Sequence, residues 1–179
     1  DLVYLSALDY DHLGQEKNVR PRPGETASAT TLEGASDGTK TWSTYTSSDD
    51  FVSMLNALGY AGSSQVGYAF TYVYSPVEQP VNIKFDGADF IKVFLNGEPI
   101  TTSFQNQSHT TPVKDQNTVT LVNLKAGMNF LMVKMITVHS WSTWGFYMRI
   151  TDSAGSDILN NVTAWDVAVT GSVYEVRGR

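Results

Sequence analysis

Aromatic side chains in polar surroundings are the residues of this sequence best suited to contact a ligand. Trp141 stands in the stretch HSWSTWGF, between serines and close to His139. A flat ring on a loop can stack on the C–H face of a sugar while polar neighbours bond its hydroxyl groups. We therefore expect Trp141 to contact a ligand and place His139 beside it, although a lone histidine is more often a surface residue. Trp144 falls in phase with Phe146 and Met148, so it is expected in the core.

Trp42 and Tyr45 form a second aromatic pair, surrounded by threonine and serine. In an extended chain the two rings face opposite sides, so one is expected in the core and the other at a solvated edge. The alternative is that either ring serves as a sugar platform, with the hydroxyl groups around it as hydrogen-bonding partners.

Cationic residues suggest a third kind of site, on the face of a sheet. The positions of three expected strands that lie outside the core pattern hold Lys92, Lys134, Tyr147 and Arg149. If these strands are neighbours, the face could bind an acidic sugar such as a uronate, with Arg149 bidentate to the carboxylate. The alternative is a solvated face, on which charged ends reach water while their stems cover apolar surface.

Alternation of apolar and polar residues predicts that β-strands carry these side chains, because a period of two sends neighbours to opposite faces. Strands are expected at residues 39–46, 66–75, 81–85, 90–95, 119–124, 129–138, 144–151, 167–169 and 173–176, with a short apolar one at 2–5. The strand at 129–138 is apolar on both faces and should be central. Asn96-Gly97 and the stretch 125–127 predict hairpin turns.

One helix is predicted, at residues 48–59. Ser48 or Asp49 can cap its start and Gly59 can end it. Helical spacing is followed by Phe51, Met54, Leu55 and Leu58.

These elements predict an all-β fold, an antiparallel β-sandwich of jelly-roll type with one short helix. Helices do not alternate with the strands, which argues against a parallel α/β fold. We expect one domain over residues 1–179, with a loop-rich N-terminal part at residues 1–38. The polar stretch 9–33 is expected to be an ordered loop or edge and not a helix, and the stretch 101–117 a long polar loop.

Composition argues against several functional classes. The chain has no cysteine, which excludes thiol catalysis, disulfides and cysteine-ligated zinc. A net charge of −6 argues against nucleic-acid binding. No apolar run approaches the roughly 18–20 residues of a membrane span. The motifs G-x-S-x-G, H-E-x-x-H, G-x-G-x-x-G and the P-loop do not occur, and no enzyme activity is expected.

About half of the chain, residues 66–155, resembles a known family. A YAFTYVYSP strand is followed by the turn VFLNG, the strand LKAGMNFLMVK, the strand WGFYMRI and a D-x-x-G turn. This order is similar to that of galactose-binding-domain-like β-sandwiches, the carbohydrate-binding modules of bacterial polysaccharide-active enzymes. The resemblance implies a partner that is a polysaccharide or oligosaccharide. It also implies a secreted or cell-surface bacterial protein with a flanking catalytic or surface domain.

Calcium is the cofactor that this resemblance makes plausible, because such sandwiches often carry one structural ion. Calcium takes roughly six to eight oxygen ligands from carboxylates and loop carbonyls. Acidic pairs stand at positions 9/11, 49/50, 86/89 and 152/157, and we favour Asp86 and Asp89 as the metal ligands.

The expected function is therefore non-catalytic carbohydrate binding. The module would attach an exported enzyme or surface protein to a polysaccharide by aromatic stacking and polar contacts. The alternative is a structural or adhesive spacer of a cell-surface protein without a small ligand, whose aromatic residues belong to the core or to a protein interface. A small hydrolase, the third reading, would require two carboxylates facing each other across a cleft.

Overall fold

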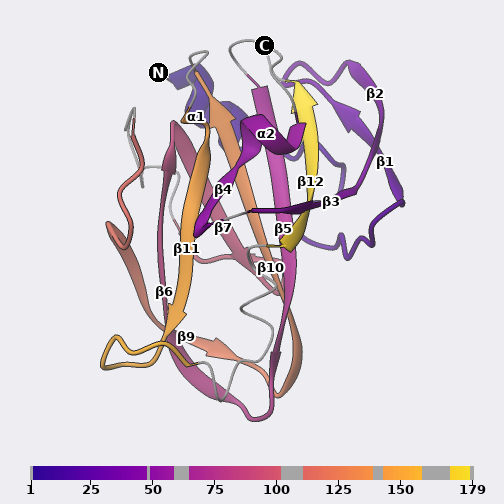
Figure 1. Ribbon diagram of the computed structural model, residues 1–179. Helices are drawn as coiled ribbons and strands as arrows, with labels where there is room; N and C mark the ends of the chain where they lie inside the picture. The colour runs from indigo at the N-terminus through magenta and orange to yellow at the C-terminus, as the bar shows by residue number, and fades with distance from the viewer. Residues whose placement is uncertain are drawn as a thin grey trace.

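The computed structural model describes residues 2–47, 49–58, 65–101, 111–138, 143–158 and 170–177, and these form two antiparallel sheets that pack face to face (Figure 1). The large sheet contains, in spatial order, β3 (Ser43–Thr46), β12 (Thr170–Arg177), β5 (Gln65–Ser75), β10 (Gly127–Thr137), β7 (Phe90–Leu95) and β8 (Glu98–Pro99). The small sheet contains β4 (Phe51–Ser53), β11 (Gly145–Thr151), β6 (Gln79–Ala88) and β9 (Asn117–Leu124). The predicted all-β antiparallel sandwich is confirmed.

Three further elements complete the described chain: a hairpin of β1 (Thr26–Thr30) and β2 (Ser36–Thr41), and the helices α1 (Leu2–Asp9) and α2 (Met54–Leu58). The strands predicted at 66–75, 81–85, 90–95, 119–124, 129–138, 144–151 and 173–176 are all present, with small shifts at their ends. The strand predicted at 167–169 lies outside the described residues. None of the helices that the structure describes is long and apolar enough to cross a membrane.

The main core lies between the two sheets. It is built from the inward-facing residues of both, among them Val73, Ile83, Phe85, Val93, Val133, Trp144, Phe146 and Ile150. β10 is central, as predicted, because it pairs with β5 on one side and with β7 on the other. Both of its faces are buried: Leu131, Val133 and Met135 belong to the main core, and Phe130, Met132 and Ile136 to a second cluster.

This second cluster covers the outer face of the large sheet. We call residues 2–42 the N-terminal segment; it comprises α1, a loop and the β1–β2 hairpin, in indigo and violet in Figure 1. Its buried side chains Leu8, Ala29 and Trp42 pack in the same cluster as Tyr68 and Phe70 of β5. The segment therefore shields an apolar sheet face that would otherwise be open to water.

The prediction of a strand at residues 2–5 is wrong, because these residues begin α1. Ala7 and Leu8 of this helix are buried against the large sheet. A short apolar run has no period long enough to separate a strand from a buried helix, and the packing partner decides.

The helix predicted at 48–59 is largely wrong as well, since only the short α2 is helical. Phe51 and Val52 form β4 and pair with Tyr147 and Phe146 of β11. Asp49 accepts the backbone N–H of Phe51 at 2.7 Å, so it closes a local turn instead of capping a helix. Pairing at the edge of the small sheet outweighs the helical spacing of the apolar residues.

The two predicted turns have different outcomes. Asn96 and Gly97 adopt φ of 53° and 87°, and they join β7 to β8 in the predicted hairpin. The turn at 125–127 does not form a hairpin, because β9 pairs with β6 in the small sheet whereas β10 belongs to the large one. The chain crosses between the sheets there. Asn129 secures the crossing by accepting from Lys125 N at 3.0 Å and donating to Lys125 O at 2.8 Å.

Candidate functional site

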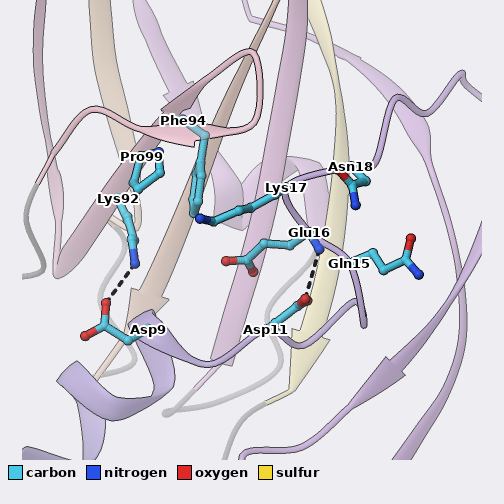
Figure 2. A pocket seen from close by; sticks show the side chains of 9 residues that line it. All are labelled: Asp9, Asp11, Gln15, Glu16, Lys17, Asn18, Lys92, Phe94 and Pro99. Atoms are coloured by element: carbon cyan, nitrogen blue, oxygen red, sulfur yellow. Dashed lines mark hydrogen bonds and ion pairs between the residues drawn. The ribbon is translucent and has the colours of Figure 1, made fainter.

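A pocket of about 310 Å³ lies where the N-terminal segment meets β7 and β8. Figure 2 shows the side chains around it, which come from two parts of the sequence far apart from each other. The end of α1 and the loop after it supply most of them, and the large sheet supplies the rest: Asp9, Asp11, Gln15, Glu16, Lys17, Asn18, Lys92, Phe94 and Pro99. Seven of these nine side chains carry polar groups, although most of the surface that they turn to the pocket is apolar. The pocket therefore combines apolar stems and rings with hydrogen-bond donors and acceptors.

Glu16 is held in the wall of this pocket by buried partners from the large sheet. Its carboxylate accepts from Lys134 Nζ at 3.0 Å and from the Tyr68 hydroxyl at 2.7 Å. Lys134 is fully buried and also donates to the carbonyl of Tyr10. Burial lowers the pKa of Lys134 to about 8, against the opposing effect of the Glu16 carboxylate. Burial, followed by Glu16, raises the pKa of Tyr68 well above its ordinary value.

Asp11 fixes the turn that carries the next residues of the wall. Its two carboxylate oxygens each accept one backbone N–H, from Leu13 and from Glu16, both at 3.0 Å. A carboxylate has about four lone-pair sites, so these two bonds leave capacity for a ligand hydroxyl. Asp9, at the end of α1, accepts from Lys92 Nζ at 2.7 Å and closes the other side of the pocket.

His12 ties α1 to β1 behind the pocket. Its ring nitrogens lie 2.8 Å from the carbonyl oxygen of Thr30 and 2.9 Å from that of Ala7. The imidazole is buried, and burial together with the Lys134 ammonium lowers the pKa of His12. Hydrogen bonds of His12, Asp11 and Glu16 therefore hold this loop in place, and its residues form a fixed wall of the pocket.

Lys17 is the cation of the pocket that is most open to solvent. Its closest ion-pair partner is Glu98, at 4.0 Å, and the two side chains are 61% and 78% exposed. An exposed pair at that distance contributes little to stability. Gly97 permits the close approach of the Lys17 backbone, since a Cβ on that glycine would lie 2.2 Å from the Lys17 carbonyl oxygen. The β7–β8 hairpin and the loop thus meet at this glycine.

The predicted aromatic pair, Trp42 and Tyr45, lies on opposite faces of the large sheet. Trp42 is 2% exposed and packs edge-to-face on Phe70, with ring centroids 5.1 Å apart. Tyr45 is half-buried against the main core. The strand predicted at 39–46 is interrupted at Trp42, so the two rings belong to separate elements. The expectation of opposite faces is confirmed, and the Trp42 ring has no free face for a sugar.

The predicted cationic face is divided between the two sheets. Lys92 and Lys134 are direct cross-strand neighbours in the large sheet. Tyr147 and Arg149 lie on β11 of the small sheet, where Arg149 pairs with Asp115 and Asp157. These four side chains therefore do not form one site. The alternative of a solvated face is also wrong for Lys134, which is fully buried.

Trp144 is 3% exposed and lies in the main core, as predicted. Trp141 and His139, the first choice for ligand contact, lie outside the described residues. Their role stays a prediction.

Asp86 and Asp89, the predicted metal ligands, are both buried and hydrogen-bonded to protein groups. Asp86 accepts from the backbone N–H of Val113 at 2.7 Å, and Asp89 from that of Val138 at 2.7 Å. Among the residues that the structure describes, no three His, Asp or Glu side chains gather as ligands for a metal ion. The calcium site stays a prediction.

The sequence does not reveal the pocket, because most of its residues stand in the stretch 9–33, for which the pattern predicts only an ordered loop or edge. One signal was available. Lys134 stands in the middle of a strand that is apolar on both faces, and a buried lysine requires an acidic partner. That partner had to come from a part of the chain that covers β10, and Glu16 is that residue.

Comparison of the chain with family models, with curated proteins and with solved structures finds no match.

Proposed function

We propose that this chain is a non-catalytic carbohydrate-binding module and that the pocket beside β7 receives a sugar unit. The observation that carries the proposal is the set of polar side chains around this pocket, part of which buried hydrogen bonds hold in place, beside a surface that is otherwise mostly apolar. Its volume of about 310 Å³ lies at the lower end of ligand sites, which span roughly 300–1,000 Å³. One sugar unit of a longer chain, with the remainder in solvent, suits such a site.

The chemistry of the lining supports a polyhydroxylated ligand. A hydroxyl group donates one hydrogen bond and accepts others, so it pairs equally well with ammonium, amide and carboxylate groups. Lys17, Gln15 and Asn18 are exposed at the pocket, and Asp11 is exposed beside them. The apolar ring of Pro99 adds a face for the C–H groups of a sugar. Modest affinity is expected, because an open site leaves much of the ligand wet.

The carboxylates of the pocket favour binding over hydrolysis. A glycosidase needs one carboxyl group as proton donor and a second as nucleophile or base, placed on opposite sides of the bond. Glu16 is engaged by Lys134 and Tyr68, and Asp9 by Lys92. These two groups act as hydrogen-bond acceptors for the protein itself, which suits a structural role.

A structural or adhesive spacer is the second candidate, and one observation favours it. Trp42 is covered and Tyr45 is half-buried, so two of the predicted sugar platforms are used in packing. In a spacer the pocket would be a gap in the packing between the N-terminal segment and the large sheet, and it would receive no ligand. The setting in a secreted or cell-surface bacterial protein, with a flanking catalytic or surface domain, is part of either proposal.

The experiment is affinity electrophoresis against a panel of soluble plant, algal and bacterial polysaccharides. We expect retention by one polymer class, and loss of retention in Asn18→Trp, which places a large ring at the pocket. Gln116→Trp, an equally large change at an exposed position beside the small sheet, is the matched control and should be retained normally. A folded protein that no polymer retains would leave the spacer as the favoured function.

Two additional arms test the remaining expectations. Runs with calcium and with a chelator test the predicted metal site at Asp86 and Asp89, because a structural ion that supports the site would make retention depend on calcium. Trp141→Ala tests the predicted aromatic contact. Release of reducing sugar from a retained polymer would show that the protein is a hydrolase.

A further inference from the structure

We propose that the pocket selects a neutral sugar unit, with Lys17 donating to one of its hydroxyl groups and Asp11 accepting from another. This inference rests on the proposed carbohydrate binding and names the class of sugar. The selectivity for a neutral sugar follows from the ion pairs in and behind the pocket, which leave no excess of positive or negative charge in its lining.

Most of the charges are already paired within the protein. Asp9 is bonded to Lys92 at 2.7 Å, and Glu16 to Lys134 at 3.0 Å. The charges that then remain in the lining are one cation, Lys17, and one anion, Asp11. The pocket therefore has no excess of one sign to offer a charged ligand.

An anionic sugar meets two obstacles at this site. Its carboxylate or sulfate would compete for Lys17 with Glu98, which lies 4.0 Å away, and would lie in the same pocket as Asp11. To reach Lys92 instead, it would have to displace Asp9 from a partly buried ion pair. The whole chain also carries a net charge of −6, which repels anionic polymers at low ionic strength.

A cationic amino sugar is disfavoured for the corresponding reason. Glu16 and Asp9 are engaged with lysines, so Asp11 is the one carboxylate of the lining left to receive an ammonium group, and Lys17 lies in the same pocket. In the view of Figure 2 the Lys17 side chain extends across the pocket, so an ammonium ligand would face a like charge there. A neutral hydroxyl pair uses the donor and the acceptor together without the desolvation cost of a buried charge.

The experiment titrates the protein with three sets of oligosaccharides of equal length, one neutral, one built from uronates and one from amino sugars. Calorimetry is performed at about 0.02 M and about 0.5 M salt, where charge interactions differ most in screening. We expect binding of a neutral set with an affinity that salt leaves unchanged within about twofold. Lys17→Met should weaken this binding by about tenfold or more, because it removes a charge-assisted hydrogen bond.

Lys17→Gln separates hydrogen bonding from charge. Glutamine keeps an N–H donor, so affinity for the neutral sugar should be less affected than in Lys17→Met. Lys125→Gln removes an exposed cation elsewhere on the chain and should bind like the original protein.

The outcomes distinguish this inference from the proposed function. Tight, salt-sensitive binding of uronates or amino sugars would overturn the inference and leave carbohydrate binding intact. Neutral binding that is indifferent to both Lys17→Met and Asn18→Trp would place the site elsewhere and overturn the inference as well. Failure of every oligosaccharide to bind would overturn the proposed function itself.

Discussion

The outer faces of the two sheets differ in whether the ion pair of their cationic side chain is buried or partly exposed. On the large sheet, the N-terminal segment covers Lys134 completely, and the lysine bonds Glu16, a residue 118 positions away in the sequence. On the small sheet, Arg149 stays partly exposed and pairs with Asp115 and Asp157. Both cations occupy outward positions of a strand. The strand pattern is the same in both cases. Whether a chain segment packs over the sheet face determines whether such a cation forms a buried ion pair with that segment or stays partly exposed at the surface.

The difference has energetic consequences. A buried pair has lost its water, so the removal of one partner leaves an uncompensated charge in the interior. A surface pair exchanges its partner for water at little cost. The contact between the N-terminal segment and the sheet, which is also the wall of the pocket, therefore depends on Lys134 and Glu16 far more than the small sheet depends on Arg149.

The largest effect is expected for Lys134→Met. Glu16 would keep its charge in the interior without its main partner, and the free energy of unfolding should fall by about 3–5 kcal/mol. Urea unfolding measures this change. The double variant Lys134→Met with Glu16→Met should recover most of the loss, because both charges are then gone. If Lys134→Met alone were as stable as the original protein, the claim that stability depends strongly on the buried Lys134–Glu16 pair would be wrong.

The pH dependence of stability gives the second effect. The pKa of Lys134 is about 8 in the folded protein and 10.5 in the unfolded chain, so between these values the unfolded chain holds a proton that the folded one has lost. The free energy of unfolding should therefore rise from pH 8 to pH 10.5 through this group, whose burial is most costly below pH 8. The double variant supplies the reference, and it should lack this rise. Parallel pH profiles for the two proteins would contradict the assignment.

A smaller effect is expected for Tyr68→Phe. The substitution removes the hydroxyl that donates to Glu16 at 2.7 Å and leaves that carboxylate with one bond fewer, at a cost of about 1–3 kcal/mol. Tyr74→Phe, at a tyrosine of the same strand that is 42% exposed, is the matched control and should change stability little. Equal effects of the two substitutions would mean that the buried bond contributes nothing.

The smallest effect is expected on the small sheet. Asp115→Asn removes one of the carboxylates bonded to Arg149 and should lower the free energy of unfolding by about 0–1 kcal/mol at low salt. Added salt should reduce even this difference, since the side chains are partly exposed and screened. Thermal unfolding at two ionic strengths measures it. A loss of unfolding free energy as large as that of Lys134→Met would show that burial does not distinguish the ion pairs of the two sheet faces.

The sequence predicts the sandwich well because alternation over long strands is a strong local signal. β10, with apolar residues on both faces, was correctly placed at the centre of a sheet. The errors at residues 2–5 and 48–59 lie in short elements whose form is decided by a packing partner from elsewhere in the chain. The turn at 125–127 shows the same limit, because local turn residues do not specify whether the next strand joins the same sheet.

The site was less predictable than the fold for a physical reason. Residue type alone favours the aromatic residues as ligand contacts, yet Trp42 packs in the cluster beneath the N-terminal segment. The pocket depends on how a polar loop folds over the large sheet, and that depends on a contact between Glu16 and Lys134 across most of the chain. Lys92 is predicted on the outer face of its strand and Asp9 and Asp11 as one of four acidic pairs, and all three line the pocket, but nothing local in the sequence shows that they lie together.

The most direct test of the account is hydrogen-exchange mass spectrometry of the protein with and without the oligosaccharide that it binds most tightly. A sugar seated in the pocket should slow exchange in the segments that form its two walls, residues 9–18 and 92–99, and leave β9 and β11 unchanged. Protection confined to residues 139–144 would place the sugar at Trp141. That result would contradict the claim that the N-terminal segment builds the site.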